Sequence, residues 1–329
     1  MLLDPQQTRA LIVHALEHRY AVLAVNADSP AAVVDVLEAA SACDAPVIIE
    51  TSLWQLKGRS YGAGDALLGL SLYRAQVAAL AGHPRLRGVP VVLHTDHIKG
   101  PETFAILEAA LGAYSSLSLD SSDMTPAQNI AAIGRLCASA QARGEPLALE
   151  MEAGVDAGVS SLADCDALFG VAERNHPGYL ALWAPGVGTR HGLGSDGYPS
   201  FSDRAVAAHQ QRASELAGRP IGIALHGSSG LPGESLRAAV QAGAAKVNWS
   251  SESLLLRSEA AQRFFATHGA ELDRHHKDWK STAMDNGLQT FVSGEYIPRV
   301  IERIKLLGGA GHGTAFLRDG RVPAPRGPR

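Results

Sequence analysis

YAVLAVNADSPAAVVDVLEAASACDAPVIIETS, residues 20–52, sets a pattern that repeats along the whole chain. A short apolar run (20–25) is followed by turn residues, a helical pattern and a second short apolar run (46–50). Parallel strands that are covered by helices on both faces read as short, continuous apolar runs. The stretch therefore predicts a β-strand, an α-helix and a second, parallel β-strand.

Six more apolar runs follow in the same alternation. They are PVVLH (90–94), SSLSL (115–119), PLALEM (146–151), YLALWA (179–184), IGIAL (221–225) and AAKVN (244–248). Helix signals lie between them, because Pro101, Pro126 and Pro232 stand where helices begin and Gly243 is placed to end one. Eight strands alternating with helices predict an α/β fold, the (β/α)8 TIM barrel. A doubly wound sheet usually has a glycine-rich turn after its first strand, and none follows Val25.

The 329 residues are interpreted as one barrel domain, 1–307, which includes additional C-terminal helices at about 253–307. We expect the Gly/Pro/Arg-rich tail, 308–329, to be disordered. Hydrophobic residues make up 46% of the chain and charged residues 19%, which excludes a disordered or fibrous protein.

The charge and the cysteines restrict the partners and the compartment. A net charge of −4 and a pI near 6.3 argue against a nucleic-acid-binding surface. No apolar run approaches the roughly 18 residues of a membrane helix. The N-terminus lacks a signal peptide's apolar stretch, and Cys43, Cys137 and Cys165 show no C-x-x-C spacing. We therefore expect a cytoplasmic protein with reduced thiols and neither nucleic-acid nor membrane partners.

Polar residues end every predicted strand or begin the loop that follows it. They are Asn26, Ser52, His94, Asp96, His97, Asp120, Ser122, Glu150, Glu152, His191, His226 and Asn248. Active sites of TIM barrels lie at the carboxyl ends of the strands, so these side chains are expected to share one mouth.

Three of these positions supply histidines, namely His97, His191 and His226. Three imidazoles with an open fourth position are typical of a catalytic zinc site, although cobalt or another divalent ion suits the same ligands. The other nine histidines outside the strand ends are interpreted as solvated. They are His14, His18, His83, His176, His209, His268, His275, His276 and His312.

The loops after the last two strands are candidates for phosphate binding. HGSSG (226–230) and NWSS (248–251) combine glycines, which allow backbone N–H groups to approach an anion, with serine hydroxyls. Phosphate sites of TIM barrels often use these two loops. The alternative is a pair of ordinary Gly/Ser turns.

The motifs resemble those of the class II, metal-dependent ketose-bisphosphate aldolases from about residue 8 to 257, and more weakly beyond. The opening stretch already quoted is similar to that family's first βαβ unit. The other matching segments are HTDH (94–97), LEMEAG (149–154), GTRHG (188–192), LHGSSGLP (225–232) and AAKVNWSSE (244–252). Their shared order makes the resemblance specific.

The resemblance implies a function and roles for individual residues. It implies retro-aldol cleavage of a ketose phosphate, or a related sugar-like substrate, through a metal-stabilised enediolate. The zinc ligands would be His97, His191 and His226, with Glu152 as a possible alternate ligand, and Asp96 would be the acid/base at the aldehyde oxygen. Donor and phosphate contacts would come from Asn26, Ser52, Gly192, Gly227, Ser229, Asn248, Ser250 and Ser251. The family also implies a homodimer or homotetramer, with contacts expected in 253–307.

Three mismatches with the family pattern involve four positions. Ser195 stands where the family has a phosphate-site lysine, and Arg190 or Lys99 is expected to supply the missing charge. Ser160 replaces a loop glutamate that moves the donor proton, a task for which Asp156 or Asp164 is the candidate. Ser250 and Ser251 replace the usual Asp or Ala and the Thr. These changes predict a divergent substrate rather than fructose 1,6-bisphosphate.

Three alternatives remain open at this point. Lys246, on the eighth predicted strand, is a possible Schiff-base nucleophile, although a structural role suits its segment better. A non-catalytic relative would keep the metal for sensing or structure. A zinc-assisted epimerase or hydrolase would use the same site on another carbonyl compound.

Overall fold

Eight parallel strands form a barrel in the computed structural model, which describes all residues except 101, 121–122, 155, 157, 194–199 and 320–329. The strands are β1 (Val22–Asn26), β2 (Val47–Thr51), β3 (Val91–Thr95), β4 (Leu117–Leu119), β5 (Leu149–Glu152), β6 (Leu180–Ala184), β7 (Gly222–Leu225) and β8 (Ala244–Trp249). Their order is β3-β2-β1-β8-β7-β6-β5-β4, and the isolated bridges His94–Ser116 and Ile98–Leu119 join β3 to β4. The predicted TIM barrel is confirmed.

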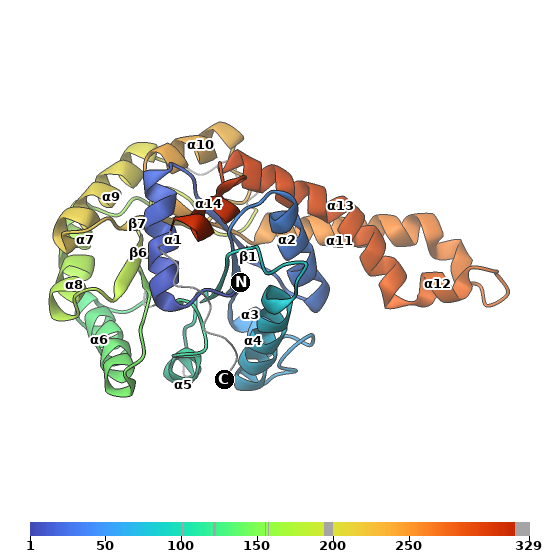
Figure 1. Cartoon of the computed structure of the whole chain (residues 1–329), viewed down its shortest axis with the longest axis horizontal. Coiled ribbons are helices and arrows are strands. Elements are labelled where there is room, and N and C mark those ends of the chain that lie inside the picture. Colours follow the sequence, from blue (N-terminus) through green and yellow to red (C-terminus); the bar gives the residue numbers. More distant parts are fainter. Residues whose placement is uncertain (101, 121–122, 155, 157, 194–199, 320–329) are drawn as a thin grey trace.

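Helices surround the strands (Figure 1). They are α2 (Pro30–Ala42), α3 (Leu53–Lys57), α4 (Ala66–Gly82), α5 (Thr103–Ala110), α6 (Pro126–Arg143), α7 (Leu162–Cys165), the π-helical η2 (Asp166–Gly170), α8 (Val171–Asn175), α9 (Asp203–Ala217) and α10 (Gly233–Gln241). Thr125 caps α6 through a capping box with Gln128, and α10 begins directly after Pro232, as predicted. Pro101 lies outside the described residues, and α5 begins at Thr103.

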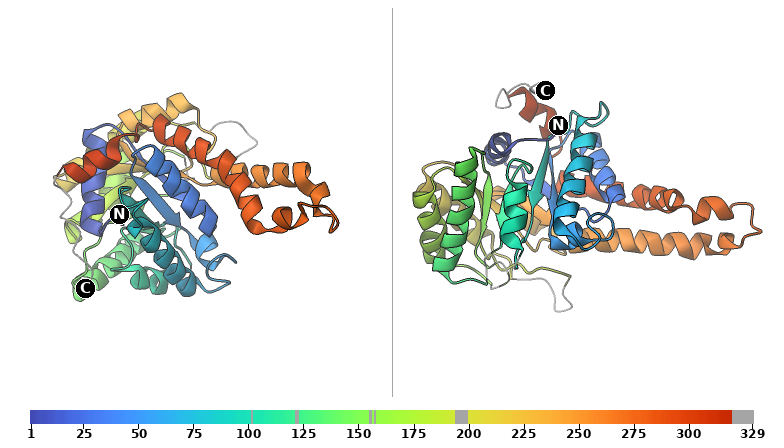
Figure 2. Two further views of the ribbon diagram at one scale, coloured as in Figure 1. Left: turned by 45° about the vertical axis from the view of Figure 1, so that its right-hand side comes forward. Right: turned by 90° about the horizontal axis from the view of Figure 1, so that it is seen from below.

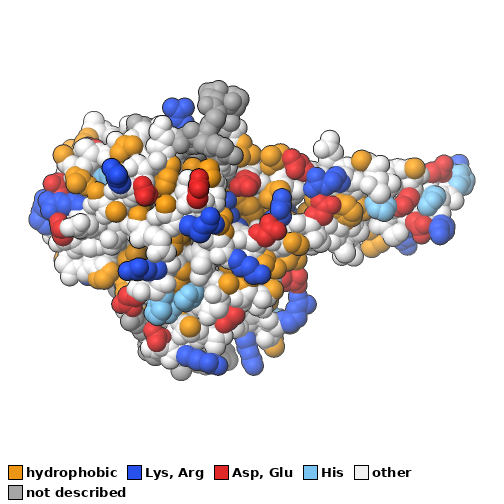
Figure 3. Space-filling view, turned by 90° about the horizontal axis from the view of Figure 1, so that it is seen from above, with side chains coloured by type: hydrophobic (Ala, Val, Ile, Leu, Met, Phe, Trp, Pro, Cys, Tyr) orange, Lys and Arg blue, Asp and Glu red, His pale blue; other side chains and the backbone are white. Residues whose placement is uncertain are grey.

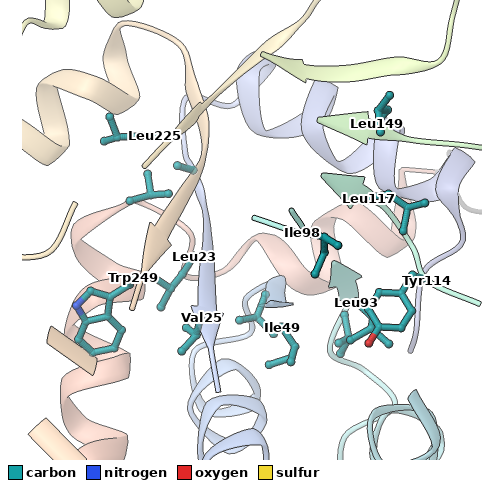
Figure 4. Packing of buried hydrophobic residues seen from close by; sticks show 14 of the residues in the cluster. Leu23, Val25, Ile49, Leu93, Ile98, Tyr114, Leu117, Leu149, Leu225 and Trp249 are labelled. Atoms are coloured by element: carbon teal, nitrogen blue, oxygen red, sulfur yellow. The ribbon is translucent and has the colours of Figure 1, made fainter. Parts of the chain in front are cut away.

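Side chains alternate between the two faces of each strand, which separates two regions of the core. Outward residues such as Leu23, Ile49, Leu93 and Trp249 belong to the cluster between strands and helices (Figure 4). The inward residues change in character along the barrel axis. At the amino ends they are apolar and often small, as in Val22, Ala24, Ile48, Val92, Leu182, Ala224 and Ala245. Toward the carboxyl ends they become charged or polar, so the fold directs chemistry to one mouth.

Two terminal helices pack against the apolar interior residues. These are α1 (Pro5–Glu17) and α14 (His312–Arg318), which contribute Leu11, Ile12 and the fully buried Phe316 to that cluster. The expected disorder from residue 308 is therefore wrong for 308–319, because a buried phenylalanine anchors the last helix. Residues 320–329 lie outside the described residues.

Two histidines interpreted as solvated are buried. The His14 ring lies against Tyr20 and Phe316, and its Nδ1 is 2.9 Å from the Tyr20 hydroxyl. The Nδ1 atom of His209 accepts a hydrogen bond from Trp183 Nε1 at 3.3 Å, and its Nε2 lies 3.0 Å from the Ser160 carbonyl. Both rings contact residues that are distant in the sequence, so their burial could not be inferred from the sequence pattern.

The additional C-terminal helices form an arm that projects from the barrel (Figures 1 and 2). It consists of α11 (Ser251–His268), the 3-10 helix η3 (Gly269–Leu272), α12 (Trp279–Ala283) and α13 (Asp285–Leu306). At its base Arg257 pairs with Asp35 of α2, and Ser293 donates a hydrogen bond to the same carboxylate at 2.6 Å. In the described parts of the chain, no helix is long and apolar enough to cross a membrane.

Candidate metal centre and active site

A cavity of about 780 Å³ lies at the carboxyl ends of the strands and is lined mainly by residues of the loops that follow them. Its lining includes nearly all the residues predicted for the site, namely Asn26, Ser52, Asp96, His97, Glu152, His191, Gly192, Gly227, Ser229, Asn248, Ser250 and Ser251. His226 is buried directly beside it and touches His97. The fold thus brings together side chains from residue 26 to residue 251.

Three imidazole nitrogens meet at one point. The Nε2 atom of His97 lies 3.0 Å from Nε2 of His191 and 3.0 Å from Nδ1 of His226. The opposite nitrogen of each ring faces a carboxylate. His97 Nδ1 is 3.0 Å from Glu152, His191 Nδ1 is 2.9 Å from Asp156, and His226 Nε2 is 2.7 Å from Glu150.

These outer contacts set the tautomers of the three rings. A carboxylate accepts only from an N–H, so each ring in its neutral form carries its proton on the outer nitrogen and presents a lone pair inward. The lone pairs of His191 and His226, each facing that of His97 across 3.0 Å, repel it unless a cation lies among the three rings. His–carboxylate pairs of this kind are the usual support of imidazole metal ligands. The donor set therefore fits a divalent ion with an open position.

The electrostatics of the site also favour a positive charge. Burial disfavours the imidazolium form of His97, but the Asp96 and Glu152 carboxylates outweigh this and raise its pKa far above the ordinary value. Burial and the neighbouring His226 and His97 lower the pKa of His191. One positive charge is thus favoured among the three rings, and a second is disfavoured.

The backbone at the site is adapted to this convergence. His97 has φ of 49°, a left-handed conformation that is uncommon for a residue other than glycine and is found at functional positions. Gly227 has φ of 62°, and a Cβ there would lie 2.5 Å from the Arg190 carbonyl oxygen. Only glycine therefore permits the loops after β6 and β7 to approach this closely.

Asp96 is held beside the histidines by two amides. Asn26 Nδ2 donates to one carboxylate oxygen at 2.9 Å, and Asn248 Nδ2 donates to the other at 3.1 Å. Burial alone would raise the pKa of Asp96, but His97, Lys246 and His226 lower it well below its usual range. The side chain is therefore a fixed carboxylate facing the cavity, 3.7 Å from His97 Nε2.

A layer of buried charge lies beneath the histidines. The Lys246 ammonium is 2.8 Å from Glu150 and 2.7 Å from Glu50, and the neutral His94 ring lies beside them because burial and Lys246 lower its pKa to about 3. Burial and Asp96 raise the pKa of Glu50 to about 8. Glu50 was missed because its strand read as wholly apolar, although alternation from Ile48 places it inward with Glu150 and Lys246.

Glu150 links this buried layer to the three histidines, because one of its oxygens accepts from His226 and the other faces Lys246. Replacing Glu150 with Gln removes the charge that sets the His226 tautomer. We expect zinc affinity to fall about tenfold or more, as for other outer partners of metal ligands. Competition with a chromogenic chelator measures this. Glu234→Gln, on the exposed side of α10, is the matched control, and equal affinities for the two variants would contradict the assignment.

The loops after β7 and β8 form the candidate phosphate site. Ser229 Oγ accepts a hydrogen bond from the Glu252 backbone N–H at 3.2 Å, which joins the first loop to the start of α11. The Ser250 side chain makes no capping bond to this 18-residue helix, and Ser250 and Ser251 line the cavity. Beneath the loops, Arg303 donates to the Ser228 carbonyl at 2.9 Å. The arrangement suits an anion bound by backbone N–H groups and hydroxyls.

The residues involved in the departures from the family pattern differ in whether they line the cavity. Ser160 accepts a hydrogen bond from the Gly186 N–H at 2.9 Å and is not among the described residues lining the cavity. Asp164 caps α7 with Ser161, whereas Asp156 lines the cavity and contacts His191. Ser195 lies outside the described residues.

The two cationic side chains expected to replace the missing lysine also differ in their position relative to the cavity. Lys99 lines the cavity, whereas Arg190 is exposed and is not among the described lining residues. Lys246, the possible Schiff-base nucleophile, is fully buried, and Glu150 and Glu50 outweigh the effect of burial and raise its pKa. An ammonium held in this way offers no free amine to the cavity.

Comparisons with known proteins agree with this geometry. The profile of the family described as class-II fructose-bisphosphate aldolase matches residues 6–312. The fructose-bisphosphate aldolase of Streptococcus pneumoniae serotype 4 is 28% identical over 271 residues, which are 79% of this chain and 84% of that protein. The enzyme of that name from Candida albicans is 28% identical over 282 residues, 75% of this chain and 77% of the relative.

Two solved structures share the fold. The crystal structure of the Campylobacter jejuni fructose-bisphosphate aldolase has a TM-score of 0.79 at 19% identity, covering 94% of this chain and 96% of that one. The YdjI aldolase of Escherichia coli K12 has a TM-score of 0.70 at 20% identity, covering 95% and 100%. At these identities the structures support the barrel and the arrangement of its elements.

Proposed function

Because the chain belongs to the class II fructose-bisphosphate aldolase family and is a lyase of that kind, we propose that it is a zinc-dependent aldolase. Its reaction is the reversible cleavage of a ketose phosphate, or a related sugar-like substrate, to a dihydroxyacetone phosphate-type donor and an aldehyde. The observation that carries the proposal is the convergence of three imidazole lone pairs beside the Asp96 carboxylate at one mouth of the barrel.

The site residues divide the work of the reaction. His97, His191 and His226 hold the divalent ion, which supplies a Lewis acid for the charge that develops on the donor. In cleavage, Asp96 accepts the proton of the acceptor-side hydroxyl while the carbon–carbon bond breaks and its electron pair passes to the donor carbon. In condensation, Asp96 returns that proton to the aldehyde oxygen.

The remaining contacts orient the two reactants. Asn26 and Asn248 keep the Asp96 carboxylate fixed, so no reorganisation is needed when the proton moves. Ser52 and Gly192 lie at the cavity wall, and the donor phosphate is received by Gly227, Ser229, Ser250 and Ser251. Glu152 contacts the outer nitrogen of His97 and lines the cavity, so we assign it as the alternate ligand.

One observation favours a second candidate function, a non-catalytic relative that retains the metal. Ser160 supplies no carboxylate for the donor proton at the position where the family has one.

The experiment that separates the candidate functions is condensation of dihydroxyacetone phosphate and of dihydroxyacetone with a panel of aldehydes, with and without a chelator. Chelator-sensitive formation of a carbon–carbon bond supports the aldolase. Zinc binding without product from any pair would support the non-catalytic candidate, and turnover of a carbonyl compound without bond formation would indicate an epimerase or hydrolase.

The arm is the surface through which we propose that the enzyme forms a homodimer or homotetramer in the cytoplasm. It projects from the barrel and carries exposed hydrophobic side chains among charged ones (Figure 3). They are Leu255, Phe265, Leu272, Trp279 and Met284. Packing the arm against a second copy would remove these five apolar side chains from water. Light scattering coupled to size-exclusion chromatography should give at least twice the 34.5 kDa chain mass. The double substitution Phe265→Glu with Met284→Glu should reduce this mass. A monomeric unaltered protein would contradict this.

A further inference from the structure

The cavity has two opposite rims. In a closed ring of eight strands β3 stands across from β7 and β4 across from β8. The β7 and β8 rim carries the Gly/Ser loops of the candidate phosphate site. A donor that binds there and reaches the three histidines at the centre therefore points its reacting carbon toward the rim formed by the loops after β2, β3 and β4. The acceptor aldehyde must occupy that rim, which we call the acceptor rim. Its residues are Trp54, Lys99, Asp120 and Asp123.

The acceptor rim has an excess of negative charge. Lys99 is the one lysine or arginine among the described residues that line the cavity, and its ammonium lies 2.8 Å from Asp123 and 3.4 Å from Asp120, which is also 3.6 Å from His97 Nδ1. One ammonium therefore faces two carboxylates. Among the residues that the structure does not describe, 101, 121–122, 155, 157 and 194–199 contain no lysine or arginine in the sequence, and the arginines are confined to 320–329. A second phosphate at this rim would meet like charge rather than a cation that is free to pair with it.

Trp54 gives the same rim an apolar surface. The residue is 87% exposed although it lines the cavity, and it stands in the first turn of α3, where its backbone N–H donates to Ser52 Oγ at 3.2 Å. Lys57 of α3 pairs with Glu102, which joins this helix to the segment after β3 that carries Lys99. An indole beside carboxylates and an ammonium suits a molecule with C–H faces and several hydroxyls.

We propose that the acceptor is an uncharged hydroxyaldehyde, so that the sugar substrate carries no phosphate at its acceptor end. Trp54 packs against its carbon chain, and Asp120, Asp123 and Lys99 bind its hydroxyl groups. This inference rests on the proposed aldolase function and names the substrate class for the half of the site that the family resemblance leaves open.

The test compares glyceraldehyde with glyceraldehyde 3-phosphate as acceptors for dihydroxyacetone phosphate on the zinc-loaded full chain. We expect kcat/KM to be at least about tenfold higher for glyceraldehyde. Asp123→Asn should reduce this ratio, because it removes one of the repelling charges. Equal values, or a preference for the phosphorylated aldehyde, would overturn the proposal.

The tryptophan is tested separately. Trp54→Ala should raise the KM for glyceraldehyde more than the KM for the donor, and Trp54→Phe should restore most of the loss. Leu72→Ala, an exposed apolar residue of α4 that does not line the cavity, is the matched control and should change neither constant. If Trp54→Ala behaved like Leu72→Ala, the acceptor rim would be wrongly assigned.

A measurement without any aldehyde separates this proposal from the proposed function. Zinc-dependent exchange of a donor proton of dihydroxyacetone phosphate with solvent needs no acceptor. If the proton exchanges but the enzyme shows no preference for glyceraldehyde, the acceptor proposal alone is overturned. The same holds if the proton exchanges but neither aldehyde is used. Absence of exchange overturns both.

Discussion

Replacing Asp96 with Asn is expected to lower kcat for aldol cleavage about a thousandfold, within the range for loss of a general acid–base group. The amide has nearly the shape of the carboxylate but cannot accept the hydroxyl proton when the carbon–carbon bond breaks. It also disturbs one of the two hydrogen bonds from Asn26 and Asn248. Each of these amides donates to a different oxygen of the Asp96 carboxylate, and an asparagine at position 96 keeps only one oxygen as an acceptor. Steady-state rates in both directions measure the effect.

Two controls accompany this substitution. The zinc content of the variant shows whether the metal centre survives, since Asp96 lies 3.7 Å from His97. Asp203→Asn, at the exposed start of α9, makes the same chemical change away from the cavity and should leave kcat unchanged. A zinc-loaded Asp96→Asn protein with the kcat of the unaltered chain would remove Asp96 from the mechanism.

Replacing His97 with Ala is expected to remove bound zinc and, with it, nearly all turnover. His97 is the residue whose Nε2 faces both other imidazoles, so its loss leaves two ligands and removes one of the partners of Glu152, another being Ser118. A metal that contributes about 4 kcal/mol of transition-state stabilisation corresponds to about a thousandfold in rate. Metal analysis after dialysis and cleavage assays at saturating zinc measure the two losses.

The matched control is His83→Ala, an exposed histidine at the end of α4. It should keep one zinc per chain and full activity. If His97→Ala retained both zinc and rate, the three-histidine centre would be the wrong site.

The strands were predictable because a strand that is buried on both faces has a continuous run of apolar residues. The run at 20–25 becomes β1 at Val22–Asn26, and the other seven strands lie close to their predicted positions. The three histidines were predictable for a related reason, since position at a strand end fixes which mouth a side chain reaches. Both inferences depend only on local pattern and on the topology of the barrel.

Features that depend on partners distant in the sequence were not predictable in the same way. Glu50 and Lys246 are 196 positions apart, and only the closed barrel places them together. Trp54 follows the strand-end residue Ser52 but is apolar, so the pattern of polar strand ends did not select it, and its role follows from where the cavity opens. Phe316 sits in a tail of low-complexity composition, yet a space beneath the barrel buries it.

The most direct test of the account follows deuterium entering the hydroxymethyl carbon of dihydroxyacetone phosphate by NMR, with no aldehyde present. Exchange by the zinc-reconstituted protein is expected to stop when a chelator removes the ion and to return when zinc is restored. Borohydride is expected to trap no adduct on Lys246. Exchange that persists in the chelator, with the donor trapped on Lys246, would contradict a metal-dependent aldolase built on His97, His191 and His226.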